Sequence, residues 1–321
     1  LIHCDNVYIR NDYPYCENCY ENTSGYIRSY DYQPFLCFYD YVDKKIVRTN
    51  SSYKASKIPY YGIELEVECI EGSREEYAEK ITYYGGSEEK FFYCKSDGSL
   101  NHGFEVCTMP MTFNAIKQLN IYEGVLKHRG SNALQSYNTS TCGIHIHINR
   151  ESFTDHHLFK FISFIHEFKG LVYLISQRKK VAELNQYAKF NNSFKDITKK
   201  EMVSSIKRKK SYHKANKHLD SYNPQKKHST VSYGEKYVPV NLQHSDTIEI
   251  RIFKGNLRET SFRKNVEFID SLYYFTKINP IYRLKVRDYL DHCFRELKTY
   301  PNLNRFIENN SDKVKRILEF P

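Results

Sequence analysis

The feature that most constrains the fold is an alternation of ionisable and apolar residues in four short segments. These are residues 62–68 (GIELEVE), 103–107 (GFEVC), 143–148 (GIHIHI) and 248–252 (IEIRI). Successive side chains of a β-strand point to opposite faces, so each segment is predicted to be a strand with one apolar face and one ionisable face. If the four strands share one sheet, a single face carries a concentration of Glu, His and Arg.

Two interpretations of that face are open. The wet face of an antiparallel sheet is usually polar and has no function. Such faces normally carry Lys, Thr, Ser and mixed charges, whereas three of these strands carry only acids or only His at the alternating positions. Clustered carboxylates repel one another unless a cation lies among them, and a neighbouring Arg suits phosphate. We therefore interpret the face as that of an enzyme that uses metal and nucleotide.

Size and composition allow a large hydrophobic core. The chain has 321 residues, of which 40% are hydrophobic and 15% aromatic, enough for one large domain or a large and a small one. No apolar run approaches the ~20 residues of a membrane span, and no signal-peptide pattern is present. Nine scattered cysteines do not resemble a disulfide framework, which predicts an intracellular, cytoplasmic protein.

The net charge of +10 is concentrated in one segment, residues 177–228, while the remainder of the chain is close to neutral. We interpret this segment as a basic insertion. One explanation is a solvated surface insertion, and the other is a loop that binds phosphate or acidic groups. Because it lies between the His segment and the Glu-Arg segment, it is also a candidate lid over their site.

Residues 1–47 are predicted to form a small cysteine-containing module. Cys16 and Cys19 form a Cys-x-x-Cys knuckle of the kind that supplies two ligands to a structural Zn²⁺, and Cys4 and His3 lie nearby. The alternative is that both are ordinary loop thiols. The sequence starts at Leu1 without Met, and we expect it to start inside a zinc-ribbon-like motif.

The second predicted domain spans residues 58–321. Further strands are expected at 90–95 and 237–242, and helices at 71–84, 114–128 and 154–176, the last capped by Thr154 or Asp155. From about residue 261 the chain is expected to be mainly helical and to pack behind the sheet.

The order of five motifs resembles the putative amidoligase family over roughly residues 60–268. The motifs are 62–68, 95–100 (KSDGSL), 103–110 (GFEVCTMP), 142–147 (CGIHIH) and 247–253 (TIEIRIF). The resemblance implies an α+β fold with an antiparallel glutamine synthetase-like sheet and helices on its outer face. It also implies an ATP-dependent carboxylate–amine ligase that uses Mg²⁺ or Mn²⁺ and an acyl phosphate to form an amide. The knuckle resembles modules that precede this domain in phage-type proteins.

The resemblance also implies residue roles. Arg251 is expected at the transferred phosphate, and either His145 or His147 at the nucleotide phosphates, with the choice left open. Lys95 and Asp97 fall at a family motif and serve substrate or metal, although a surface turn explains Asp97 equally well. Asn241 matches a recurring position near the cofactor. The expected Mg²⁺ ligands are Glu64, Glu66, Glu105 and Glu249, with Glu68 a weaker candidate.

Two alternatives to the ligase remain. One is a phosphotransferase of the same fold class, and the other is a non-enzymatic nucleic-acid-binding module made of the knuckle and the basic insertion. Nucleic acid is the less favoured partner because the acidic strands would repel a phosphate backbone. The expected partners are ATP, an amine and a carboxylate substrate such as an acidic peptide or protein. The sequence leaves the oligomeric state open.

Overall fold

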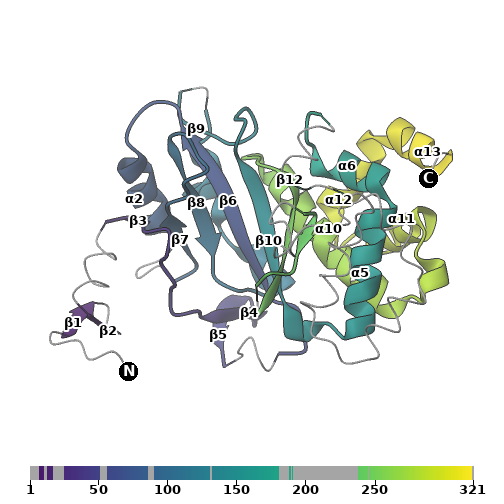
Figure 1. Cartoon of the computed structure of the whole chain (residues 1–321), viewed down its shortest axis with the longest axis horizontal. Helices are drawn as coiled ribbons and strands as arrows, with labels where there is room; N and C mark the ends of the chain where they lie inside the picture. Colours follow the sequence, from purple (N-terminus) through teal and green to yellow (C-terminus); the bar gives the residue numbers. More distant parts are fainter. Residues whose placement is uncertain are drawn as a thin grey trace, which may run out of the picture. The chain divides into compact units, whose positions relative to one another are not determined.

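All four alternating segments are β-strands, as predicted (Figure 1). They are β6 (Tyr61–Cys69), β8 (Gly103–Thr108), β10 (Gly143–Asn149) and β12 (Thr247–Lys254). Their apolar residues are fully buried, with exposed fractions of 0–1% for Ile63, Leu65, Val67 and the isoleucines of β10 and β12.

The computed structural model describes residues 7–10, 13–16, 25–50, 56–85, 90–130, 132–180, 188, 190, 238–244 and 246–319. Most of the basic insertion and Cys19 lie outside these residues, as does the side chain of Cys16, so the zinc prediction is not tested. The chain divides into two compact units. Unit 1 comprises Leu1–Asn50, Gly62–Ile144 and Gly255–Glu259, and unit 2 comprises Ser51–Tyr61, His145–Lys254 and Thr260–Pro321. The predicted domain boundary between residues 47 and 58 stays a prediction.

The sheet of unit 1 is mixed. Its strand order is β3 (Ile27–Arg28), β7 (Phe92–Lys95), β8 and β6, and β9 (Leu134–Gln135) also pairs with β6. β6 and β7 both run antiparallel to β8, but β3 runs parallel to β7, so the prediction of a purely antiparallel sheet is wrong here. A parallel pair needs a long connection, and the residues between β3 and β7 supply it.

Unit 1 also contains a helix that packs on this sheet and two separate antiparallel strand pairs. Helix α2 (Arg74–Tyr84) packs against β7 and β3, and β4 (Phe38–Val42) pairs with β5 (Lys45–Thr49). β1 (Val7–Arg10) pairs with β2 (Tyr13–Cys16).

The single helix predicted at 114–128 is wrong. The chain forms α3 (Phe113–Gln118), α4 (Ile121–Gly124) and the short 3-10 helix η2 (Leu126–His128), because Leu119 adopts an extended conformation with ψ 125°.

In unit 2, β11 (Val240–Asn241) pairs with β12, which pairs with β10. The helix predicted at 154–176 is two helices, α5 (Asp155–Glu167) and α6 (Lys169–Ser176), since Phe168 leaves the helical conformation. The predicted cap is confirmed, because the Thr154 hydroxyl accepts a hydrogen bond from His157 N at 3.2 Å.

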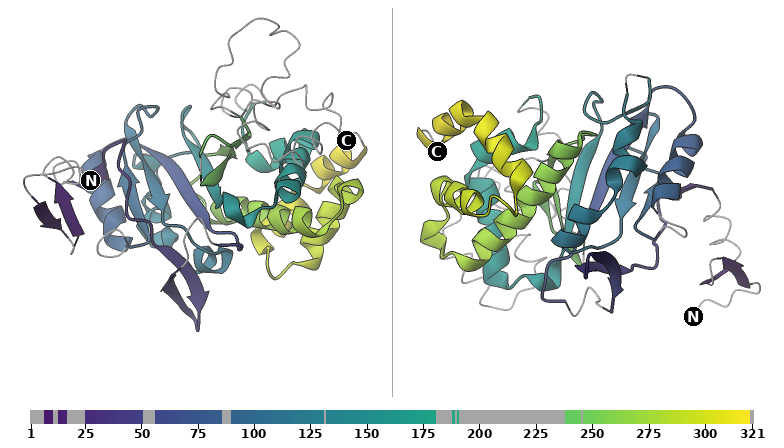
Figure 2. Two further views of the ribbon diagram at one scale, coloured as in Figure 1. Left: turned by 60° about the horizontal axis from the view of Figure 1, so that its bottom comes forward. Right: turned by 180° about the vertical axis from the view of Figure 1, so that it is seen from behind.

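The C-terminal part of unit 2 is helical, as predicted. Its elements are α10 (Glu259–Ile278), the 3-10 helix η5 (Ile281–Arg283), α11 (Val286–Arg295), α12 (Pro301–Asn309) and α13 (Ser311–Glu319), drawn in green to yellow in Figure 2. Helix α6 packs on β12, and α13 packs on α6. None of the helices in the described part of the chain combines the length and the apolar character that crossing a membrane requires.

Buried Arg178, just after α6, fixes the position of β12. Its Nε donates to Ile252 O at 3.1 Å, and its Nη2 donates to Phe253 O at 3.1 Å and to Arg251 O at 3.3 Å. The buried guanidinium of Arg178 thus fixes the backbone of β12, the strand that carries Glu249 and Arg251.

Candidate active site

Unit 1 carries an acidic cluster, which we define as Glu64, Glu66, Glu105 and Cys107. The antiparallel register of β6 and β8 places Glu64 opposite Cys107 and Glu66 opposite Glu105. On the other side of β8, Lys95 of β7 lies opposite Glu105. Residues opposite one another in antiparallel strands share a face, so three carboxylates, a thiol and one ammonium group lie on one side of this sheet.

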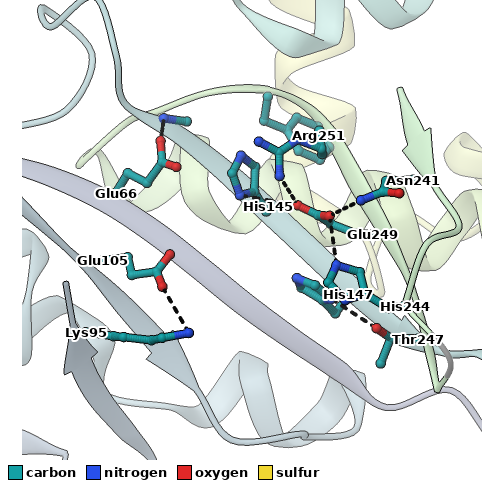
Figure 3. Close-up of polar contacts among 12 residues, drawn as sticks. Glu66, Lys95, Glu105, His145, His147, Asn241, His244, Thr247, Glu249 and Arg251 are labelled. Carbon is teal, nitrogen blue, oxygen red and sulfur yellow. Dashed lines mark hydrogen bonds and ion pairs between the residues drawn. The ribbon is translucent and has the colours of Figure 1, made fainter. Parts of the chain in front are cut away.

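The surroundings of Glu105 disfavour its ionised form. Its side chain is 8% exposed, and the ammonium of Lys95 lies 3.9 Å from its Oε1, beyond hydrogen-bond distance (Figure 3). Burial, followed by the charge of Glu64, raises the pKa of Glu105 to about 9, and Lys95 only partly opposes this. Without a further cation, the carboxyl group of Glu105 is held in its neutral form at pH 7.

The donor atoms of the acidic cluster suit a divalent cation. One carboxylate oxygen each from Glu64 and Glu105 and the sulfur of Cys107 all lie within 4.8 Å of one another. Carboxylate oxygens are the ligands that Mg²⁺ and Mn²⁺ prefer. Half-buried Glu64 also gives the cluster a side open to solvent. The residues present therefore fit the metal that the sequence predicted.

Glu66 and Glu68 both make contacts that hold the fold. The backbone N–H of Gly143 donates to Glu66 Oε2, the dashed contact at Glu66 in Figure 3. Oε1 of Glu68 accepts hydrogen bonds from Thr141 Oγ1 at 2.5 Å and from the backbone and side-chain nitrogens of Asn101, each at 3.2 Å. Three donors on one oxygen give Glu68 a structural role.

Asp97 lies in the turn after β7. Its Oδ1 accepts a hydrogen bond from Ser99 N at 2.7 Å, the geometry of an Asx-turn. This contact supports the turn explanation for Asp97, whereas Lys95 is directed at the acidic cluster by its ion pair with Glu105.

Unit 2 carries a second group of ionisable residues, the histidine–arginine cluster. Glu249 of β12 is at its centre and only 2% of the residue is exposed. Its Oε1 accepts a hydrogen bond from Arg251 Nη1 and lies 3.5 Å from His145 Nδ1. Its Oε2 accepts from Asn241 Nδ2 at 2.8 Å and contacts His244 Nε2 at 3.2 Å (Figure 3). The members of the cluster are Glu249, Arg251, Asn241, His145, His147 and His244.

The electrostatics of Glu249 are opposite to those of Glu105. Burial alone would raise the pKa of Glu249, but the hydrogen bond with His244 and the charges of the other cluster members outweigh burial and lower that pKa. Glu249 is therefore a stable, ionised anchor for the guanidinium and imidazole groups around it.

The two histidines predicted from the sequence have different contacts. His145 is 6% exposed and lies beside Glu249. His147 is half-buried, its Nδ1 lies 3.2 Å from Thr247 Oγ1, and its ring centroid is 5.3 Å from that of His244. The assignment of His145 or His147 to the nucleotide phosphates stays a prediction.

His244 contacts Glu249 but was not predicted from the sequence as a site residue. This residue lies in the short connection between β11 and β12, outside the alternating pattern, and its side chain is 49% exposed. In the antiparallel pair of β11 and β12, Asn241 lies opposite Glu249. The short connection between the two strands therefore lies close to Glu249, and His244 contacts the Glu249 carboxylate. The shortness of the connection between the two predicted strands was the available signal.

The described part of the chain thus combines an α+β fold with a buried, ionised Glu-x-Arg pair and a carboxylate cluster that fits a divalent cation. A model of the family described as putative amidoligase enzyme matches residues 86–273, more than half of the chain. The chain belongs to this family, which is one of amide-forming ligases in general. The match contains Glu105, both predicted histidines and the Glu249–Arg251 pair, whereas Glu64 and Glu66 precede it. No curated protein matches the chain.

Proposed function

We propose that the protein is an ATP-dependent carboxylate–amine ligase that forms an amide bond through an acyl phosphate. The observation that carries the proposal is the acidic cluster. Glu64 and Glu105 place carboxylate oxygens within 4.8 Å of one another, and burial of Glu105 together with the charge of Glu64 raises the pKa of Glu105. In a chain of the amidoligase family, this is the arrangement expected for a site that takes up Mg²⁺ or Mn²⁺ with a nucleotide.

The reaction has two balanced steps. In the first, a substrate carboxylate oxygen attacks the γ-phosphorus of ATP, and the bond to ADP breaks. In the second, an amine nitrogen attacks the acyl carbon, inorganic phosphate leaves with its electron pair, and the nitrogen loses a proton. Both steps need neutralisation of phosphate charge more than covalent help from the protein.

In unit 1, Glu64, Glu66 and Glu105 would hold the metal. A bound Mg²⁺ supplies charge neutralisation at the phosphate oxygens. Lys95 lies next to Glu105 and adds a positive charge that can pair with a substrate carboxylate or a phosphate. Asp97 stays a weaker candidate because its carboxylate is engaged in a turn.

In unit 2, we assign Arg251 to the transferred phosphoryl group, with His145 or His147 as a further phosphate donor. Both carboxylate oxygens of Glu249 are engaged by Arg251, Asn241 and His244. These contacts favour a positioning role for Glu249, and for Asn241 through it, over the metal-ligand role that the family resemblance implied. Arginine is suited to phosphate because its guanidinium is planar and always charged.

The remaining expectations belong to this proposal and need their own tests. They are a glutamine synthetase-like catalytic fold, a structural Zn²⁺ at Cys16 and Cys19, a cytoplasmic location and an acidic carboxylate substrate recruited by the basic insertion.

The direct test is a thermal unfolding experiment with Mg²⁺ and a non-hydrolysable ATP analogue on the wild type, Glu64→Gln and Arg251→Met. A ligand present at about 100 times its Kd stabilises the folded protein by about 2.7 kcal/mol. We expect the nucleotide analogue to add a shift beyond that of Mg²⁺ alone, and to do so only when Mg²⁺ is present. This nucleotide-dependent shift should be lost in Glu64→Gln and reduced in Arg251→Met. Lys127→Ala, which breaks an exposed i,i+4 pair with Glu123, is the control and should respond as the wild type does.

Absence of a shift in the wild type would contradict the proposal. A product assay separates the ligase from the phosphotransferase alternative. ADP formed together with an amide product supports the ligase, whereas ADP formed with a phosphorylated acceptor and no amide supports the phosphotransferase.

A further inference from the structure

The thiol of Cys107 lies in the acidic cluster, and the proposed ligase reaction gives it no role. Cys107 is 4% exposed and lies on the same face of β8 as Glu105. The strand register places it between Glu64 of β6 and Tyr93 of β7. The Tyr93 side chain also shares a hydrogen bond with this thiol, while burial, followed by the charges of Glu105 and Glu64, raises the pKa of Cys107 and keeps it protonated in the absence of metal. Cys107 is therefore held facing the carboxylates.

Two carboxylate oxygens and one sulfur have a spacing close to that of a metal site. The Cys107 sulfur and one oxygen each from Glu64 and Glu105 lie within 4.8 Å of one another. Donor atoms around a tetrahedral Zn²⁺ are about 3.5 Å apart, given bond lengths of about 2.0 Å to oxygen and 2.3 Å to sulfur. A contraction of at most about 1.3 Å would bring the three donor atoms to this spacing.

A separate observation indicates that a cation belongs at this position. The side chain of Glu105 is 8% exposed and faces the cluster. Among the described residues, no hydrogen bond to its carboxylate is found, and its polar partner, Lys95, is 3.9 Å away. A buried carboxylate without a close partner is costly, and a directly bound cation removes that cost.

We propose that Cys107 makes the acidic cluster a selective site for a thiophilic divalent cation such as Zn²⁺ or Cd²⁺, bound by Glu64, Glu105 and Cys107. The inference deepens the proposed function, on which it rests for the role of this cluster. On binding, the S–H bond of Cys107 breaks, a sulfur–metal bond forms and the proton passes to the buffer. Mg²⁺ prefers oxygen ligands and gains little from sulfur, whereas Zn²⁺ and Cd²⁺ gain strongly. Zn²⁺ then competes with Mg²⁺ for the cluster and inhibits the ligase.

The test must separate Cys107 from the other thiols of the chain. The full-length protein carrying Cys16→Ser and Cys19→Ser removes the predicted N-terminal zinc ligands. Cys94 is the matched control, because it is a buried cysteine on neighbouring β7 whose position alternates with Tyr93 and Lys95 and so lies on the opposite face.

Cd²⁺ is titrated into this background, and the thiolate-to-metal charge-transfer absorption is recorded together with the Zn²⁺ and Mg²⁺ affinities. We expect one equivalent of Cd²⁺ to produce the absorption. Cys107→Ser should abolish it and lower the ratio of Zn²⁺ to Mg²⁺ affinity at least tenfold, while Cys94→Ser keeps both. An unchanged absorption or affinity ratio in Cys107→Ser overturns the proposal.

A second variant keeps the test decisive if the Cys107→Ser protein does not fold. Glu64→Gln replaces a half-buried ligand and should weaken Cd²⁺ binding at least tenfold while keeping the absorption at saturation. Cd²⁺ binding as tight as in the parent protein overturns the proposal. The nucleotide-dependent thermal shift is measured separately, so a cluster that binds Cd²⁺ without any Mg²⁺–nucleotide response supports the cation site and contradicts the ligase.

Discussion

Glu105 in unit 1 and Glu249 in unit 2 are both buried glutamates on β-strands, yet their surroundings give them opposite charge states. Glu105 has a second carboxylate nearby and one distant ammonium, and its pKa is raised to about 9. Glu249 has guanidinium, imidazole and amide partners on both oxygens, and its pKa is lowered. Both glutamates are buried, so the neighbouring groups decide whether the pKa is raised or lowered. The nearest ammonium group to Glu105 lies beyond hydrogen-bond distance, whereas Glu249 is paired directly with Arg251.

The most direct test of the two charge states is to replace each glutamate by glutamine. Glu249→Gln should cost about 3 kcal/mol of unfolding free energy at pH 7, because it leaves buried Arg251 without its anionic partner. Urea denaturation of the metal-free protein measures the loss. The exposed control Lys127→Ala should cost no more than about 0.5 kcal/mol. A loss below about 1 kcal/mol would contradict the description of Glu249 as a charged anchor.

Glu105→Gln should have the opposite effect and stabilise the metal-free protein by about 2 kcal/mol at pH 8. The folded-state pKa of Glu105, about 9, lies above the usual 4.5, so the folded protein binds the extra proton. Its contribution to stability is present below pH 4.5 and is lost as the pH rises towards 9. Unfolding free energies at pH 6 and pH 8 give the test, and the gain should be smaller at pH 6. Destabilisation at both values would contradict the raised pKa.

Bound Mg²⁺ should give the acidic cluster the positive charge that Arg251 already gives Glu249. Mg²⁺ at about ten times its Kd should stabilise the wild type by about 1.4 kcal/mol, because the ion binds only the folded acidic cluster. Chelation should reverse the effect. The same addition should leave Glu64→Gln nearly unaffected while it stabilises Glu249→Gln as it does the wild type, if Glu249 positions Arg251 and is not a metal ligand. Equal loss of the metal response in both variants would assign Glu249 to the metal.

The smallest expected effect concerns His244. His244→Ala should cost about 0.5–1 kcal/mol, since its side chain is 49% exposed and supplies one of several contacts to Glu249. Urea denaturation at pH 7 measures it, with His102→Ala, an exposed residue of unit 1, as the control. A cost above about 2 kcal/mol would contradict the minor contribution assigned to His244.

The sequence predicted the strands of both clusters well and their connections less well. Alternation with a period of two is a local property, so β6, β8, β10 and β12 could be recognised directly. The helix breaks at Leu119 and Phe168 could not, because both residues sit in continuous apolar patterns. The family assignment was confirmed by the match over residues 86–273. The roles of the individual site residues stay predictions.

The sequence by itself determined which side chains share a strand face, because that depends only on backbone geometry. The tertiary structure alone decided the parallel pairing of β3 with β7, the contact between His244 and Glu249 and the placement of Cys107 beside Glu64. It also decided which buried glutamate is charged. Strand register and burial arise from contacts between residues far apart in the chain, and the pKa of a carboxyl group depends on those neighbours rather than on its own sequence position.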